Sequence, residues 1–98
     1  MNKFGSDHLA VFICPHVYEN SKPIVLVSHD ENGDWQFVCG GNHDVDEEPR
    51  LVGIIHLLER DPSLNEIADL PIHWVAERNA VGGEWIRTKS EARNGDTD

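Results

Sequence analysis

Two short segments of the chain carry residue types that can bind a metal ion. Cys14 and His16 flank Pro15, and Cys39 and His43 flank a Gly-Gly-Asn sequence. Two thiolates and two imidazoles are a ligand set of tetrahedral zinc sites. Protein ligands fill all four positions of a structural site, whereas a catalytic site keeps one position for water or substrate. The proline and the two glycines allow the chain to turn each histidine back towards its cysteine. Cys14, His16, Cys39 and His43 are therefore a candidate zinc site, structural or catalytic, and zinc binding is the alternative to the protein-binding function that the charge of the chain favours.

Two other interpretations of the same residues stay open. Free cysteines are among the most often buried residue types, so Cys14 and Cys39 could be core thiols that bind nothing. Cys39 could instead be a nucleophile assisted by His43 and Asp44 in the loop that follows it. Strand alternation points Cys39 into the core, and no oxyanion-hole motif is visible. The sequence therefore favours a protein without catalysis.

The charge of the chain favours a basic partner. Eighteen acidic and eight basic side chains give a formal net charge of −10. Such a charge repels nucleic acids and anionic membranes, and it speeds encounter with a basic protein. The predicted contacts are the acids of two loops: Asp30, Glu31, Asp34, Asp44, Asp46, Glu47 and Glu48. A plainer interpretation is that the second loop is solvated and its charges favour the N-terminus of a following helix.

No segment of the sequence predicts export or membrane insertion. Met1 to His8 lack the apolar core of a signal peptide, and no apolar run approaches the length that spans a bilayer. We therefore expect a cytoplasmic protein without a membrane partner. In that reducing compartment the two cysteines are expected to be free thiols or metal ligands.

The stretch from Ile24 to Gly41 predicts a central β-hairpin. Two apolar runs flank Asn32-Gly33, the strongest short-range hairpin signal. If these two residues form the turn, Leu26 faces Cys39 and Ser28 faces Phe37. One face of the hairpin then carries Leu26, Trp35, Phe37 and Cys39, and the other carries Val25, Val27 and Val38.

The remaining elements are expected to cover this hairpin. The apolar patterns predict a strand over 9–14, a helix from Pro49 to Arg60, a second helix capped by Asp61, and a strand over 73–78. The fold class is therefore α+β: an antiparallel sheet of about four strands in the order β-β-β-α-α-β, packed by two short helices. Residues 1–88 are expected to form a single domain, and residues 89–98 a disordered tail.

Several segments between Ile24 and Arg78 resemble a known family. They are Asp34-Trp35-Gln36-Phe37, the acidic loop, Arg60-Asp61-Pro62-Ser63-Leu64 and Ala76-Glu77-Arg78. Together they resemble the immunity-protein-33-like bacterial family of unknown function, which is grouped with immunity proteins of polymorphic toxins. The resemblance implies an α+β domain that neutralises a cognate toxin by occlusion, and it implies no catalytic residue.

Overall fold

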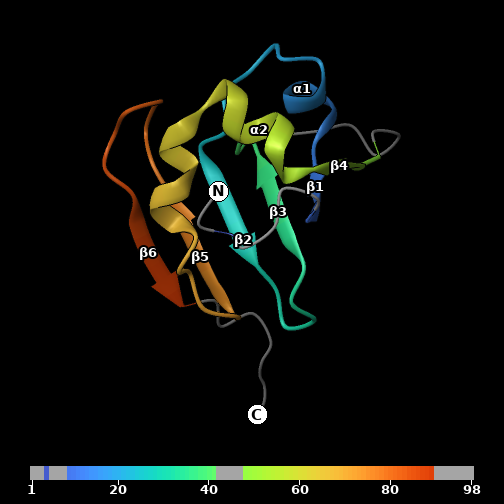
Figure 1. Ribbon diagram of the computed structural model, residues 1–98. Helices are drawn as coiled ribbons and strands as arrows, with labels where there is room; N and C mark the ends of the chain where they lie inside the picture. The colour runs from blue at the N-terminus through green and yellow to red at the C-terminus, as the bar shows by residue number, and fades with distance from the viewer. Residues whose placement is uncertain (1–3, 5–8, 42–47, 90–98) are drawn as a thin grey trace.

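The computed structural model describes Phe4, residues 9–41 and residues 48–89, and it shows a six-stranded sheet in the order β4-β1-β3-β2-β5-β6 (Figure 1). The strands are β1 Ala10–Ile13, β2 Leu26–His29, β3 Trp35–Val38, β4 Arg50–Gly53, β5 Trp74–Glu77 and β6 Ile86–Lys89. The helices are α1 Pro15–Tyr18, α2 Ile54–Arg60 and the 3-10 helix η1 Pro62–Ile67. The α+β class is confirmed. The sheet is nevertheless larger than predicted, and it is mixed, because β1 and β3 are parallel.

The predicted hairpin exists, but its register is shifted by one residue. Leu26 pairs with Val38 and not with Cys39. The Asp30 N–H donates to the Asp34 carbonyl at 2.9 Å, and the Gly33 N–H donates to the Asp30 carbonyl at 2.9 Å. The loop is therefore the three residues 31–33, and Gly33 takes the positive φ of +88° that this hairpin type requires. Asp30 favours the longer loop, because its Oδ1 accepts hydrogen bonds from the Asn32 and Asp34 N–H groups at 3.0 Å each.

The register shift changes which side chains share a face of the sheet. Val27 pairs with Phe37 and with Ala76, so these three side chains lie on one face. All three are fully buried, and Val11 and Ile13 of β1 join them in the core. The prediction that Leu26 shares the face of Phe37 while Val27 lies opposite is wrong. A shift of one residue moves every side chain of a strand to the other face.

The segment after the acidic loop also differs from the prediction. Arg50–Gly53 is strand β4, and helix α2 begins only at Ile54. Val52 pairs with Val11, so β4 protects what would otherwise be the edge of β1. Gly53 is the N-cap of α2, and the Ile54 N–H donates to the Leu9 carbonyl at 2.8 Å. The acidic loop therefore leads into a strand and not into a helix N-terminus.

The helices α2 and η1 cover one face of the sheet and lie in front of it in Figure 1. Their buried side chains complete the core: Ile54, Leu57, Leu58, Leu64 and Ile67. The predicted cap is confirmed, because the Asp61 side chain accepts a hydrogen bond from the Ser63 N–H at 3.1 Å. None of the described helices is long and apolar enough to cross a membrane. Strand β6 extends to Lys89, and residues 90–98 of the expected tail lie outside the described part of the chain.

A buried arginine joins the start of η1 to the sheet. Arg78 is only 4 % exposed. It donates two hydrogen bonds to the Ile24 carbonyl, at 3.1 and 2.8 Å, and one to Ser63 Oγ at 2.8 Å. It also forms an ion pair with Asp61, and its guanidinium lies 4.3 Å from the centre of the Trp85 ring. Two of the segments that carry the family resemblance, 60–64 and 76–78, therefore meet in one structural network.

Candidate metal centre

The structure brings three of the four predicted metal ligands together. Cys14, His16 and Cys39 each offer a ligand atom, and these atoms all lie within 4.8 Å of one another. His16 Nδ1 is 3.6 Å from Cys39 Sγ. Among the described residues, these three are the one group of histidine, cysteine, aspartate or glutamate side chains close enough together to hold a metal ion. The fourth predicted ligand, His43, lies outside the described residues.

The parallel pairing of β1 and β3 places these ligands at one end of the sheet. Ile13 pairs with Phe37, so the two strands end side by side and run in the same direction. Cys14 directly follows β1, and Cys39 directly follows β3. Pro15 then begins helix α1, which carries His16 in its only turn (Figure 1). An antiparallel β1 would have placed Cys14 at the opposite end of the sheet from Cys39.

The distances suit a tetrahedral zinc ion. With Zn–S bonds of about 2.3 Å and Zn–N bonds of about 2.0–2.1 Å, a tetrahedron separates sulfur from nitrogen by about 3.6 Å and sulfur from sulfur by about 3.8 Å. The observed distance between Cys39 Sγ and His16 Nδ1 is 3.6 Å. The largest separation within the group, 4.8 Å, exceeds the zinc value by about 1 Å, a change that a small side-chain rotation supplies.

The backbone that carries the ligands is firmly packed. Cys14 is 5 % exposed and is the N-cap of α1, and Val17 of the same helix is fully buried. Arg60 of helix α2 donates a hydrogen bond to the Val17 carbonyl at 2.8 Å. Gly40 has a φ of +76°, and a Cβ at this position would lie 3.2 Å from Val25 Cγ2. Glycine is therefore required at the turn that directs the chain away after Cys39.

The side chains of Lys22 and Cys39 both end close to Gly41. A Cβ built on Gly41 would lie 3.7 Å from both Cys39 Sγ and Lys22 Nζ. The Lys22 ammonium and the Cys39 thiol therefore approach the same small space.

A metal-free interpretation of the same geometry is an S–H···N hydrogen bond between Cys39 and His16. Both cysteines are free thiols, Cys14 buried and Cys39 half-buried. The nucleophile interpretation of Cys39 requires His43 and Asp44, and both lie outside the described residues. The described geometry does not test that interpretation. It fits both a metal ligand set and a hydrogen-bonded pair, and metal content distinguishes these two.

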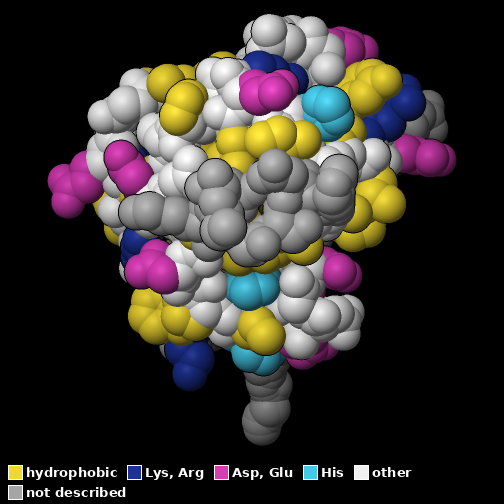
Figure 2. All heavy atoms as spheres, viewed as in Figure 1, with side chains coloured by type: hydrophobic (Ala, Val, Ile, Leu, Met, Phe, Trp, Pro, Cys, Tyr) yellow, Lys and Arg dark blue, Asp and Glu magenta, His cyan; other side chains and the backbone are white. Residues whose placement is uncertain are grey.

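Of the seven predicted acidic contacts, the four within the described residues lie at two places along β3. Asp30, Glu31 and Asp34 lie at the hairpin turn, whereas Glu48 precedes β4 at the other end of β3. Asp30 also has a structural role, since its Oδ1 accepts two backbone hydrogen bonds. Figure 2 shows the acids of the helix-covered face spread out rather than gathered in one patch. The other three predicted contacts, Asp44, Asp46 and Glu47, lie outside the described residues.

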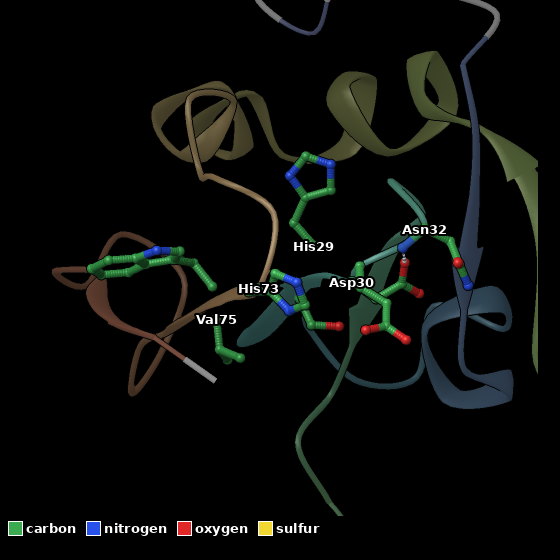
Figure 3. Close-up of a pocket in the computed structure, with 8 residues that line it drawn as sticks. His29, Asp30, Asn32, His73 and Val75 are labelled. Atoms are coloured by element: carbon green, nitrogen blue, oxygen red, sulfur yellow. Dashed lines mark hydrogen bonds between the residues drawn. The ribbon is translucent and has the colours of Figure 1, made fainter. Parts of the chain in front are cut away.

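Two histidines to which the sequence gave no role lie beside the hairpin turn. The His29 ring stacks on Trp35 at 3.9 Å between centroids, and its Nδ1 lies 2.7 Å from the Leu70 carbonyl. Figure 3 shows this ring turned towards the helices. His73 has a φ of +76°, which is strained for a residue other than glycine, and its N–H donates to the His29 carbonyl at 2.7 Å. In the correct register His29 pairs directly with Trp35, and this pairing would have indicated the stacked position of His29. No sequence signal identifies the second.

Comparison of the chain with protein-family models, with curated proteins and with solved structures found no match.

Proposed function

We propose that this protein binds one zinc ion through Cys14, His16 and Cys39. The observation that carries the proposal is the 3.6 Å distance between Cys39 Sγ and His16 Nδ1 with the Cys14 thiol in the same group. Two sulfurs and one imidazole nitrogen are the donor set that zinc prefers over magnesium or calcium. The ion joins the ends of β1 and β3 to helix α1, so its role is structural.

His43 is our proposed fourth ligand, on the basis of its spacing from Cys39. Four protein ligands close a zinc site and leave no position for substrate, in keeping with a protein that is not an enzyme. We also propose a cytoplasmic location, because a reducing compartment keeps both thiols available to the metal.

Protein purified from zinc-containing medium without chelators or an affinity tag should contain about one equivalent of zinc by mass spectrometry of metals. Cobalt in place of zinc should give the intense visible bands of a tetrahedral thiolate site. Cys14→Ser and Cys39→Ser should each reduce the zinc content to below about a tenth of an equivalent, because a thiolate is lost.

His56→Ala is the matched control, because His56 is an exposed imidazole on α2 outside the ligand group. This variant should keep its zinc. His43→Ala should weaken zinc binding if His43 closes the site. A zinc-free native protein that also fails to take up cobalt would leave the S–H···N pair as the correct interpretation.

A second proposed function is binding of a basic protein, such as a toxin that this chain neutralises by occlusion. It is supported by the net charge of −10 and by an exposed position for Glu31, Asp34 and Glu48. Exposed acids of this kind raise the rate of encounter with a cationic surface. The resemblance to the immunity-protein-33-like family supplies the toxin as a candidate.

The candidate toxins to test are the products of the reading frames next to the gene. If one of these products stops the growth of cells, co-expression of the chain should restore their growth. The triple variant Glu31→Lys, Asp34→Lys and Glu48→Lys should lower the association rate constant by about tenfold at low salt and flatten its salt dependence, measured by surface plasmon resonance. Association rates equal to those of the native chain would remove these acids from the interface.

A further inference from the structure

One face of the sheet has no helix over it in the described part of the chain. In Figure 1 the helices α2 and η1 lie in front of the sheet, and none is drawn behind it. The strand registers place an apolar side chain from each strand on this open face: Leu51, Phe12, Val38, Leu26, Val75 and Ile86. Leu51 and Ile86 of the two edge strands are 60 % and 66 % exposed, and the four side chains between them are half-buried. An apolar surface that crosses a whole sheet is typical of an interaction site.

Two hollows lie next to each other on this open face. The first, about 220 Å³, is mainly apolar and is lined by Phe12, Val38, Pro49 and Gln36. The second, about 280 Å³, is polar and is lined by Ser28, Asp30, Glu31 and His73 (Figure 3). Gln36 and Ser28 are directly paired residues of β3 and β2, so the two hollows meet at this pair.

The charges around the hollows select a cationic occupant. Asp30 and Glu31 line the polar hollow, and the exposed Glu48 precedes Pro49 of the apolar hollow. The residues that line the two hollows include no lysine or arginine. A second copy of the chain would bring a further charge of −10, and like charges oppose that association. An acidic peptide and a nucleic acid are disfavoured for the same reason.

We propose that this open face binds a segment of a basic protein, with an apolar side chain in the first hollow and a lysine or arginine side chain in the second. The inference rests on the second proposed function. The first hollow borders the proposed zinc site, because Cys14 is among the residues that line it. The strand order β1-β3-β2-β5 separates the hollows by two strand spacings, or about 10 Å. An extended chain covers this distance in about three residues. Side chains of an extended chain alternate between its two sides, so the bound segment carries its apolar and cationic side chains four residues apart, on the same side.

The test selects a phage library of random linear peptides on the immobilised full chain. Enriched peptides should carry a lysine or arginine four residues from a large apolar side chain, with micromolar affinity by calorimetry. Gln36→Arg and Glu31→Lys should each weaken these peptides by about tenfold, because each puts a cation beside a hollow. Both residues are exposed, so both variants are expected to fold.

Glu66→Lys is the matched control, since it makes the same charge change on η1, over the opposite face. It should leave peptide affinity within about twofold of the native value. No enrichment, peptides without a cation, or affinities that Gln36→Arg leaves unchanged would each overturn the proposal. Self-association that Gln36→Arg abolishes would assign the face to a second copy instead. Neutralisation of a toxin with full affinity by Gln36→Arg would keep the binding function and refute only this location.

Discussion

Replacement of Arg78 with methionine should lower the free energy of unfolding by about 3–5 kcal/mol, the usual cost of removing one partner of a buried ion pair. The variant leaves the Ile24 carbonyl, Ser63 Oγ and the Asp61 carboxylate without the donors that Arg78 supplies. A methionine fills much of the volume but donates no hydrogen bond. Urea denaturation followed by far-ultraviolet circular dichroism at neutral pH measures the difference.

Arg87→Met is the matched control for this prediction. Arg87 also pairs with an aspartate, at 2.8 Å from Asp69, but the two side chains are 34 % and 79 % exposed. Exposed ion pairs contribute only about 0–1 kcal/mol. If the two variants lost similar amounts of unfolding free energy, burial would not be the reason that the Arg78 network stabilises the fold.

The loss of unfolding free energy at acidic pH should depend on the same network of Arg78, Asp61 and Ser63. Burial opposes ionisation of Asp61, but hydrogen bonds from Ser63 and Arg78 and the charge of Arg78 outweigh it and hold the pKa of Asp61 below its usual range. A lowered folded pKa contributes stability that is present above the unfolded value of about 3.9 and is lost as the pH falls through the folded pKa. Asp61→Asn should therefore lose less stability than the native chain between about pH 5 and pH 2.

Zinc should raise the free energy of unfolding by about 4 kcal/mol when free zinc exceeds the dissociation constant a thousandfold. The physical reason is that the ligand group exists only in the folded chain, where β1 and β3 end side by side. Metal that binds the folded state alone stabilises it by mass action. Paired urea titrations in a zinc buffer and in excess chelator measure this increment.

In Cys39→Ser, zinc should no longer raise the free energy of unfolding. In excess chelator the variant should be almost as stable as the native chain, because Cys39 is only half-buried. Magnesium at the same concentration should give no increment, since it prefers oxygen ligands. An equal zinc increment in Cys39→Ser and in the native chain would place the metal elsewhere.

Local signals in the sequence predicted the existence of the hairpin but not its register. Asn32-Gly33 marks a reversal, and two-residue and three-residue loops are both compatible with it. The choice depended on Asp30, whose carboxylate accepts two backbone hydrogen bonds, and on the burial of Val27 against Ala76 of β5. The second of these contacts joins residues far apart in the chain, so no local pattern contains it.

The start of helix α2 shows the same limit. Leu51 and Ile54 fit one helical stripe, and Pro49 suits a helix start, yet Arg50–Gly53 is a strand. Its pairing with β1 protects an edge that no local pattern reveals. Gly53 was the available signal, since glycine is favoured at an N-cap and unfavourable inside a helix.

The sequence by itself determined the α+β class, the capped start of η1, the acidic charge and the presence of residue types that can bind zinc, because composition and short-range spacing encode these directly. Only the tertiary structure decided that Cys14, His16 and Cys39 form one group, because the parallel pairing of β1 with β3 places their ends together. It also decided which face of the sheet stays open. Side chains alternate along each strand, and the register, which distant strands set, decides which of them face the core.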